Sequence, residues 1–218
     1  MSRIPKLVID SSAAPTELCM IGQEAGTDKS PYNPAGHRHP YTAVYSLLFA
    51  RYKHAPIHFA EIGIAMGASL ELWSKYFKHP GARLVGFDRD WGLLNHAKER
   101  VGNPRLHVGL MDVSVDENVK DSLENAAVAG EKYDVIIDDS SHNHEHQIRI
   151  IHEAFPLLKP GGMLIVEDIF RSTAEEEYSN LIQDELGACA EAFFIECEHK
   201  FKWSPGWDND KLLVLVKA

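Results

Sequence analysis

Short apolar runs alternate with longer amphipathic stretches from residue 57 onward. This alternation predicts a parallel sheet covered by helices, because a buried strand is apolar on both faces whereas a covering helix is apolar on one side. The predicted strands are 57–62, 83–88, 105–110, 133–138 and 163–167. The predicted helices are 68–78, 90–100, 115–128, 143–158 and 174–187, and the turn Lys159-Pro160-Gly161-Gly162 is expected to end the fourth.

Two more apolar runs, 192–197 and 211–216, follow the last predicted helix. The loop between them is rich in turn-forming residues, so the two runs are expected to pair in antiparallel fashion. The predicted fold class is therefore α/β: a Rossmann-like doubly wound sheet of seven strands with a final antiparallel pair and helices on both faces.

The first 56 residues follow a different pattern. Residues 22–41 are rich in glycine, proline, asparagine and histidine, which predicts a loop, whereas 41–53 has apolar residues at helical spacing. We therefore expect residues 1–56 to form an N-terminal covering loop and helix, packed on a larger unit of residues 57–218 within one compact domain.

The charge balance and the cysteine content argue against several classes of protein. The chain has 218 residues, with 22 basic and 32 acidic side chains and a net charge of −10, so a nucleic-acid partner is disfavoured. No apolar run approaches the roughly 20 residues of a membrane helix, and the first residues do not resemble a signal peptide, so we expect a cytoplasmic protein without a membrane partner. Three cysteines without a C-x-x-C pair disfavour both a disulfide framework and a thiolate zinc site. The sequence leaves a homo-oligomer open.

Each strand of the predicted parallel sheet carries a carboxylate at its end or is followed by one. These acids are Glu61, Asp88, Asp112, Asp138, Asp139, Glu167 and Asp168. Ligands of open parallel sheets bind beyond the carboxyl ends of the strands. Any one acid would also suit a loop or a helix N-cap, but clustered like charges repel unless a cation or a donor-rich ligand lies among them. The acids together therefore predict a ligand site at one edge of the sheet.

The turn after the first predicted strand favours a nucleoside cofactor that lacks a pyrophosphate. Gly63 and Gly67 let the backbone approach a ligand and start the next helix. A dinucleotide-binding motif would have glycines where this chain has Ala65 and Ala68. Asp88 follows at about the distance at which an acid on the second strand binds a ribose diol.

S-adenosylmethionine (SAM) fits this pattern. We expect Asp88 to bind its ribose hydroxyls, Asp112 or its neighbours its adenine amino group, and the turn of residues 63–69 its methionine moiety. The expected cofactor site at the strand ends consists of Glu61, Gly63, Gly67, Ser69, Asp88, Asp112 and Asp138.

Two neighbouring strands of such a sheet also provide a candidate metal site. Asp139, Glu167 and Asp168 offer oxygen donors, which select hard cations such as Mg²⁺, Mn²⁺ or Ca²⁺, unless Asp139 and Asp168 merely begin helices. His142 follows Asp139 at the start of a predicted helix, whose positive end favours the neutral imidazole. His142 is thus the candidate general base, and His142 and Asp139 are the candidate catalytic residues. A zinc site on the run H-N-H-E-H is disfavoured because the run lacks the H-E-x-x-H spacing.

Residues 22–168 contain a set of motifs that occur together in one family. They are Gly26-Thr27-Asp28-Lys29 with His39-Pro40-Tyr41 and Tyr45, Glu61-Ile62-Gly63 through Gly67-Ala68-Ser69-Leu70, Asp138-Asp139-Ser140-Ser141-His142, and Lys159-Pro160-Gly161-Gly162 leading to Glu167-Asp168. The set resembles class I SAM-dependent methyltransferases, specifically the metal-dependent sugar O-methyltransferases of macrolide biosynthesis and the related cephalosporin hydroxylase group. Ser140 is a departure, since the family usually has glycine there.

The resemblance implies a cofactor, a metal and a role for several residues. It implies that Asp139, Glu167 and Asp168 hold Mg²⁺ and that residues 57–218 form a SAM-binding methyltransferase domain. It also implies that His142 deprotonates the acceptor hydroxyl. Finally, it implies that Thr27, Asp28 and Lys29 fold over the cofactor.

Three hypotheses about function follow. The first is a SAM- and Mg²⁺-dependent O-methyltransferase acting on a hydroxyl of a small metabolite, such as a sugar or a natural product. The second is an NAD-dependent Rossmann oxidoreductase, which Ala65 and Ala68 disfavour. The third is a non-catalytic SAM-binding module. Trp203 and Trp207, in the loop between the last two strands, are expected to form either an apolar wall for the acceptor or a contact with a neighbouring subunit.

Overall fold

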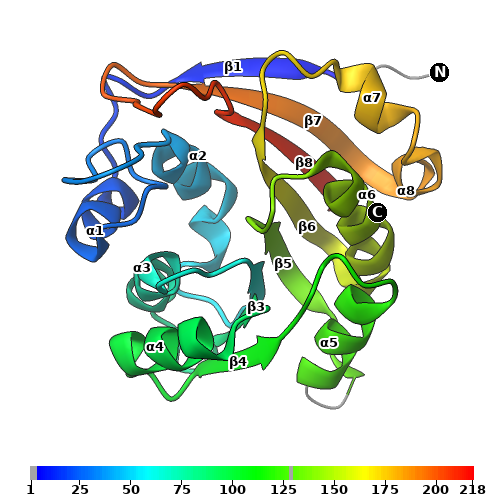
Figure 1. Ribbon diagram of the computed structural model, residues 1–218, viewed down its shortest axis with the longest axis horizontal. Coiled ribbons are helices and arrows are strands. Elements are labelled where there is room, and N and C mark those ends of the chain that lie inside the picture. Colours follow the sequence, from blue (N-terminus) through cyan, green and yellow to red (C-terminus); the bar gives the residue numbers. More distant parts are fainter. Residues whose placement is uncertain (1–3, 128–129) are drawn as a thin grey trace.

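A single mixed sheet forms the centre of the computed structural model, which describes residues 4–127 and 130–218 (Figure 1). Within these ranges the strand order is β1-β7-β8-β6-β5-β2-β3-β4. The strands are β1 (Lys6–Asp10), β2 (His58–Ile62), β3 (Arg83–Asp88), β4 (Leu106–Leu110), β5 (Tyr133–Asp138), β6 (Leu158–Ile169), β7 (Cys189–Glu198) and β8 (Lys211–Lys217). Strand β8 is antiparallel to β6 and β7, and the other neighbouring strands are parallel.

Helices cover both faces of this sheet. They are α1 (Glu17–Ala25), α2 (Tyr41–Leu48), α3 (Ala68–Tyr76), α4 (Trp91–Val101), α5 (Asn118–Ala126), α6 (His144–Ala154), α7 (Glu175–Ser179) and α8 (Gln183–Gly187), with 3₁₀ turns at Ala50–Tyr52 and Phe155–Leu157. Helices α1 to α4 lie on one side of the sheet and α5 to α8 on the other (Figure 1). Among the described residues, none of the helices combines the length and apolar character needed to span a bilayer.

Strand β5 shows how the sequence builds the core on both faces. Val135 and Ile137 belong to the apolar cluster beneath α1 to α4, whereas Ile136 belongs to the cluster beneath α5 to α7. Successive side chains of a strand point to opposite faces, so a strand that is covered on both sides is apolar at consecutive positions.

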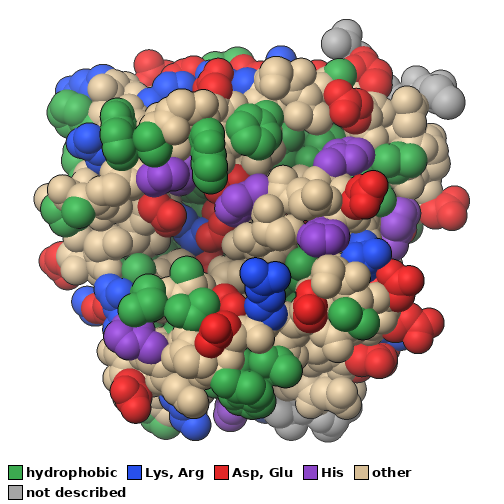
Figure 2. All heavy atoms as spheres, viewed as in Figure 1, with side chains coloured by type: hydrophobic (Ala, Val, Ile, Leu, Met, Phe, Trp, Pro, Cys, Tyr) green, Lys and Arg blue, Asp and Glu red, His purple; other side chains and the backbone are tan. Residues whose placement is uncertain are grey.

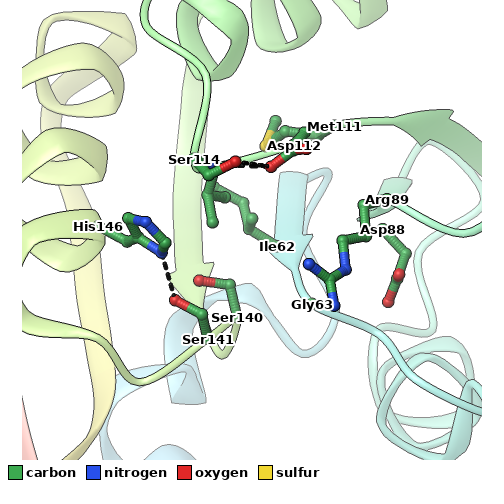
Figure 3. A pocket seen from close by; sticks show the side chains of 11 residues that line it. Ile62, Gly63, Asp88, Arg89, Met111, Asp112, Ser114, Ser140, Ser141 and His146 are labelled. Carbon is green, nitrogen blue, oxygen red and sulfur yellow. Dashed lines mark hydrogen bonds between the residues drawn. The ribbon is translucent and has the colours of Figure 1, made fainter.

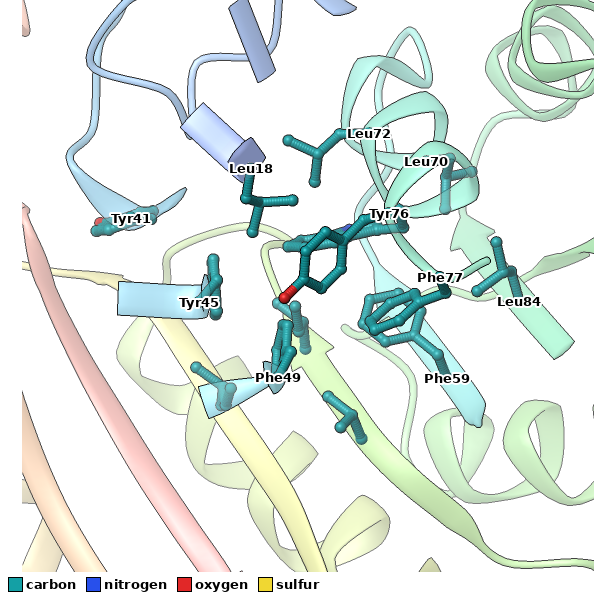
Figure 4. Packing of buried hydrophobic residues seen from close by; sticks show 14 of the residues in the cluster. Leu18, Tyr41, Tyr45, Phe49, Phe59, Leu70, Leu72, Tyr76, Phe77 and Leu84 are labelled. Carbon is teal, nitrogen blue, oxygen red and sulfur yellow. The ribbon is translucent and has the colours of Figure 1, made fainter. Parts of the chain in front are cut away.

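The first of these clusters fixes α2 with aromatic rings (Figure 4). Trp73 of α3 lies 5.4 Å from the ring of Tyr45 and 5.6 Å from that of Phe49, measured between centroids. These rings are fully buried, and truncating a buried aromatic residue typically costs about 3–5 kcal/mol. This packing therefore holds α2, and with it the hydroxyl group of Tyr45, in place at the edge of the sheet.

The predicted fold class is confirmed, with one strand more than the seven expected. The additional strand is β1, which pairs in parallel with β7 at the edge of the sheet. Its side chains are largely exposed, so the short run carries no burial pattern that marks a strand. The division between residues 1–56 and 57–218 stays a prediction, and residues 1–3 lie outside the described ranges.

Several sequence-based predictions about helices and turns were wrong. Residues 17–25 form α1, which overlaps the predicted loop 22–41, and α7 and α8 replace the single helix predicted over 174–187. Helix α6 ends at Ala154, because Pro156 in the following 3₁₀ turn cannot donate a backbone hydrogen bond. Residues 159–162 are then part of β6. Helix α5 begins at Asn118, and the last residue of the predicted helix 115–128 lies outside the described ranges.

Candidate functional site

A cleft with a volume of 550 Å³ opens at the carboxyl ends of the central strands. Its walls come from the 26–39 loop, the turn after β2, the end of β3, the segment after β5 and the end of β6. Its acidic lining residues are Asp28, Asp88, Asp139 and Asp168. Figure 2 shows a hollow in this face of the molecule, with acidic and histidine side chains inside it. The cavity therefore lies at the sheet edge that the sequence predicts to bind a ligand.

The turn after β2 needs glycine at two positions. Gly63 has φ 85°, and a Cβ atom there would lie 2.1 Å from the carbonyl oxygen of Asp139. Gly67 has φ 77°, and a Cβ atom there would lie 2.6 Å from the Cβ of Ala97 in α4. Both glycines allow the backbone to approach its neighbours more closely than any other residue would permit. The turn is thus fixed between β5 and α4.

Asp88 is oriented by this turn. Its Oδ2 atom accepts hydrogen bonds from the backbone amides of Ile64 at 3.3 Å and Ala65 at 3.2 Å. Its Oδ1 atom accepts one from the amide of Asp90 at 3.1 Å. The carboxylate therefore sits at the end of β3 in a fixed position, where it lines the cleft.

A second, smaller pocket of 250 Å³ adjoins the cleft and shares Gly63, Asp88 and Ser140 with it (Figure 3). Ile62 and Met111 give it apolar walls, and polar side chains surround them. In this rim, Ser114 Oγ donates to Asp112 Oδ1 at 2.6 Å, and His146 Nδ1 lies 2.8 Å from Ser141 Oγ. The hydrogen bonds from Ser114 lower the pKa of Asp112. A narrow apolar pocket with a few polar groups suits a planar heteroaromatic ring.

Lys29 lies among the carboxylates beneath the cleft. Its Nζ atom is 2.5 Å from Asp139 Oδ2, 2.6 Å from Glu167 Oε2 and 3.4 Å from Glu61 Oε1. Burial alone would lower the pKa of this fully buried ammonium, but the carboxylates outweigh that effect and raise it. Lys29 therefore neutralises part of the acidic cluster from below.

Two tyrosines of α2 hold the acids at the end of β6. The hydroxyl of Tyr45 donates to Glu167 Oε1, and that of Tyr41 donates to Asp168 Oδ1 at 2.6 Å. Burial, together with the neighbouring Asp168 carboxylate, raises the pKa of Glu167 to about 7, although Lys29 opposes the shift. Glu167 Oε1 accepts from Tyr45 and Oε2 accepts from Lys29, so each oxygen of this carboxylate already has a hydrogen-bond donor within the protein.

Asp139, His142 and Asp168 each place one donor atom within 4.8 Å of the other two. His142 Nε2 lies 3.5 Å from Asp168 Oδ2, and the buried Nδ1 of His142 has no hydrogen-bond partner among the described residues. His142 and Asp168 also have positive φ angles, 55° and 57°, a costly conformation that clusters at functional sites. The two carboxylates in this arrangement fit a divalent cation, and the imidazole of His142 lies beside them.

His142 lies just outside the following helix. Helix α6 begins at His144, and the side chain of its N-cap residue Asn143 accepts from the amides of Glu145 and His146 at 2.9 and 3.3 Å. The helix was predicted to start at residue 143. The cap satisfies two of the free amides of the first turn and leaves His142 to point back over the end of β5 towards Asp168.

The predicted cofactor residues do not all line one cavity. Those that line the cleft are Thr27, Asp28, Gly63, Ser69 and Asp88. Asp112 lies in the smaller pocket, and Gly67 shapes the turn without lining either cavity. Lys29, Glu61 and Asp138 are buried beneath the cleft: Glu61 accepts from Ser69 Oγ at 2.7 Å, and Asp138 accepts from Ser140 Oγ at 2.6 Å.

Sequence reasoning assigned no role to Asp210. It placed His39, Tyr41 and Tyr45 in the covering segment and in a motif, but named no partner for any of them. His39 Nδ1 lies 2.8 Å from Asp210 Oδ1 and 3.9 Å from Asp168 Oδ1. Burial lowers the pKa of His39, but the hydrogen bond to Asp210 and the charge of Asp168 raise it to about 9. The four-residue spacing of the tyrosines does place both on one helical face. The partnership of His39 with Asp210 has no sequence signal, because the two are 171 residues apart.

The fold and the two adjoining pockets define a Rossmann-like domain of the kind that binds a nucleoside cofactor at the carboxyl ends of its strands. The model of a family described as a methyltransferase domain matches residues 60–169, half of the chain. The chain belongs to this methyltransferase family, which confirms the resemblance drawn from its motifs at the level of the family.

Curated relatives match part of the chain. The 8-demethyl-8-alpha-L-rhamnosyl tetracenomycin-C 2'-O-methyltransferase of Streptomyces olivaceus is 34% identical over 138 residues, which cover 60% of this chain and 33% of the relative. The demethylmacrocin O-methyltransferase of Streptomyces fradiae is 31% identical over 142 residues, covering 62% of this chain and 33% of the relative. The matched region thus spans about a third of the length of these relatives.

Solved structures share the fold over most of the chain. The MycE methyltransferase from the mycinamycin biosynthetic pathway, in complex with Mg, S-adenosylhomocysteine (SAH) and mycinamycin VI, has a TM-score of 0.67 at 19% identity, and the match covers 94% of this chain and 56% of that one. The O-methyltransferase from Bacillus cereus in complex with SAH has a TM-score of 0.61 at 18% identity, covering 94% of this chain and 93% of that one. At these identities the likeness establishes the fold.

Proposed function

We propose that the chain is a SAM-dependent and Mg²⁺-dependent O-methyltransferase that methylates a hydroxyl of a small metabolite, such as a sugar of a natural product. The observation that carries this proposal is the convergence of Asp139, His142 and Asp168 in the cleft beside the glycine-containing turn. The names of the relatives, which include O-methyltransferases for a rhamnosyl tetracenomycin and for demethylmacrocin, support the reaction. The presence of Mg and SAH in the MycE complex supports the cofactors.

SAM would extend across both pockets. We assign its adenine to the smaller pocket near Asp112 and its ribose diol to Asp88, which lies where the two cavities join. Its methionine moiety would follow the turn of residues 63–69, with Thr27 and Asp28 of the overlying loop against it.

Mg²⁺ would be held by Asp139 and Asp168, with Glu167 as the third ligand proposed from the sequence. Each oxygen of Glu167 accepts one hydrogen bond, which leaves lone pairs for a metal. The unpartnered Nδ1 of His142 and the position of its ring beside Asp168 support this side of the cleft as the place where the reacting hydroxyl would bind. Bound Mg²⁺ would orient that hydroxyl and lower its pKa.

The protein's own residues then have three tasks. Lys29 and the tyrosines of α2 keep the carboxylates fixed, so that little reorganisation is needed during the reaction. His142 accepts the proton of the acceptor hydroxyl. The electron pair of the oxygen forms a bond to the methyl carbon as the carbon–sulfur bond breaks, and SAH leaves. The cleft mainly aligns the oxygen with the methyl group.

The test is methyl transfer from isotope-labelled SAM to a panel of hydroxylated metabolites, with Mg²⁺ and with EDTA. Asp139→Asn removes a proposed Mg²⁺ ligand and His142→Gln removes the proposed general base. Each should lower turnover about 100-fold or more while SAH affinity changes little, since loss of a general base typically costs 10²–10⁴ in rate and loss of the metal leaves the hydroxyl unactivated. His152→Gln is the matched control, since its ring pairs with Glu185 on the outer side of α6. Turnover unchanged in EDTA would contradict the metal role. SAH binding without any transfer or any effect of Mg²⁺ would favour the non-catalytic SAM-binding module.

A further inference from the structure

Strand β1 leaves one edge of the sheet open. It is the outermost strand, and among the described residues β7 is the strand that pairs with it (Figure 1). Two of its apolar side chains are exposed, Leu7 to 47% and Val8 to 64%. An edge strand with exposed apolar side chains is a template for pairing with another chain. Strand β1 lines neither of the two pockets at the cleft, so this edge is a separate surface.

The hydrogen bonds at the two ends of β1 show which way its backbone points. The carbonyl of Pro5 accepts from the amide of Phe194 at 2.9 Å, and the amide of Ser11 donates to the carbonyl of Glu198 at 2.9 Å. Both groups therefore point towards β7. Because the direction of the backbone groups alternates along a strand, the odd-numbered residues of β1 face β7 and the even-numbered residues face outward.

The outward amides and carbonyls belong to Lys6, Val8 and Asp10. No described strand pairs with these groups. A second β1 that runs antiparallel would place its own Val8 opposite Val8 and its Asp10 opposite Lys6. All three opposed pairs would then join outward-facing residues, and each such pair exchanges two hydrogen bonds in an antiparallel ladder.

The side chains of β1 are complementary to themselves in this arrangement. A two-fold axis between the central valines brings Lys6 of each copy opposite Asp10 of the other, so an ion pair forms at both ends. A parallel arrangement would instead place like charges side by side. Lys6 Nζ already lies 2.9 Å from Glu196 Oε1, and its three donors can serve a second carboxylate. The two valines would cover each other's exposed side chains.

The strand at the opposite edge of the sheet does not have these features. The outward carbonyl of Leu110 in β4 already accepts a hydrogen bond from Ser122 Oγ of α5 at 3.1 Å. Strand β4 also begins and ends with leucine, at Leu106 and Leu110, so an antiparallel copy would form no ion pair with it. The self-complementary pattern is therefore a property of β1 and not of exposed edges in general.

We propose that β1 pairs with β1 of a second copy of this chain, antiparallel and centred on Val8, so that two eight-stranded sheets join edge to edge. Each chain contributes one short strand, so the association is expected to be weak, with a Kd of about 1–100 µM. The proposal does not depend on the reaction, because β1 is apart from the cleft.

Sedimentation equilibrium of the full chain at about 1–300 µM tests the dimer. The wild-type chain should change from 24.4 kDa to twice this mass as the concentration rises. Val8→Pro should weaken the dimer about tenfold or more, because proline removes an amide that points outward while the hydrogen bonds to β7 remain. Val8→Thr is the matched control, since it keeps both the amide and the β-branched shape.

Asp10→Lys tests the ion pairs. It would place a lysine opposite Lys6 at both ends of the contact, so the dimer should again weaken about tenfold or more. Asp121→Lys makes the same change of charge on α5, beside β4, and should leave the dimer unchanged. Circular dichroism of each variant should match the wild type and so confirm that the chain is folded.

A disulfide tests the register directly. Opposed residues in an antiparallel hydrogen-bonded pair have Cα atoms about 5.5 Å apart, which lies within the range of a disulfide. In a Cys189→Ser background, which removes the partly buried cysteine, Val8→Cys should therefore form a covalent dimer under mild oxidation. Leu47→Cys, at a position that is 70% exposed on α2, should cross-link about tenfold more slowly.

Three outcomes would overturn the proposal. The first is a wild-type chain that stays monomeric over the whole concentration range. The second is a dimer that is as stable in Val8→Pro and Asp10→Lys as in the wild type, which would place the contact elsewhere on the surface. The third is cross-linking of Val8→Cys that is no faster than that of Leu47→Cys.

Discussion

At the scale of single residues, one buried ammonium group joins the acidic ends of three strands. Lys29 contacts Glu61 at the end of β2, Asp139 after β5 and Glu167 near the end of β6. Buried carboxylates are costly unless a cation and hydrogen bonds compensate them. Since Lys29 comes from the covering loop, the same contact fastens that loop over the sheet edge. Lys29, which the sequence analysis placed in the cofactor site, contacts these buried acids in the structure.

His39 should make stability depend on pH in the mildly alkaline range. Its pKa is raised from 6.5 to about 9 by Asp210 and Asp168, so the folded chain holds the proton more tightly than the unfolded chain does. The resulting stabilisation is fully present below pH 6.5 and is lost as the pH rises through about 9. A shift of this size corresponds to about 3 kcal/mol at most. His39→Gln should therefore lower the free energy of unfolding by about 1–3 kcal/mol at pH 6 and much less at pH 10.

Urea unfolding in EDTA at the two pH values measures this difference. His96→Gln is the control, because His96 is exposed on α4 and should leave the wild-type pH dependence unchanged. A loss of stability in His39→Gln that is equal at both pH values would show that the ring contributes through packing alone.

At the scale of elements, the sequence predicts the parts whose burial has a regular pattern. The strands 83–88 and 133–138 are predicted to the residue, because both are apolar runs bounded by charged or turn-forming residues. Strand β1 and helix α1 could not be predicted in this way. Strand β1 is mostly exposed and is stabilised by its hydrogen bonds to β7, almost 190 residues away. Helix α1 is short, and its N-cap Thr16 lies between regions without a clear pattern.

The candidate site could likewise be predicted only in part from the sequence. Acids at the ends of predicted strands could be placed together, since parallel strands end at one edge. The partners that orient those acids come from elsewhere in the chain: Lys29, Tyr41 and Tyr45 from the covering segment. Contacts between remote segments leave no mark on local periodicity, so only the fold reveals them.

Gly63 is the position in the turn after β2 where a side chain should be least tolerated. In Gly63→Ala the new Cβ would combine a positive φ with a clash against the carbonyl of Asp139, whereas in Gly161→Ala it would meet only the positive φ. Gly63→Ala should therefore cost about 3 kcal/mol or more and weaken SAH binding, because the clash displaces the turn and the end of β5 together. Gly161→Ala should cost about 1–2 kcal/mol and leave SAH affinity unchanged.

Thermal unfolding and SAH titration of both variants check this prediction. Equal destabilisation by the two substitutions would show that backbone conformation alone matters at Gly63. Normal SAH affinity in a clearly destabilised Gly63→Ala chain would show that the turn after β2 does not contribute to SAH binding.

At the scale of the whole molecule, the net charge of −10 is unevenly distributed. Asp138, Asp139, Glu167 and Asp168 lie together at one edge of the sheet, and burial raises the pKa of Asp138, Asp139 and Glu167. Lys29 supplies one positive charge among them. The folded chain therefore contains a preformed site of excess negative charge, which the unfolded chain, with its carboxylates apart and hydrated, does not have.

A divalent cation should stabilise the whole molecule for this reason. A ligand that binds only the folded state adds about 1.4 kcal/mol of stability for each tenfold rise in its free concentration above Kd. Mg²⁺ should therefore raise the Tm of the wild-type chain progressively over the concentration range above its Kd, and EDTA should reverse the effect. Asp139→Asn should remove most of this increase, because it deletes one of the carboxylates nearest to His142 and Asp168. Asp116→Asn, which changes an acid that is 86% exposed and pairs with Arg149, should retain it. An equal rise of Tm in both variants would mean that Mg²⁺ acts by screening the net charge of the surface, and the acidic edge would then have no metal-binding role.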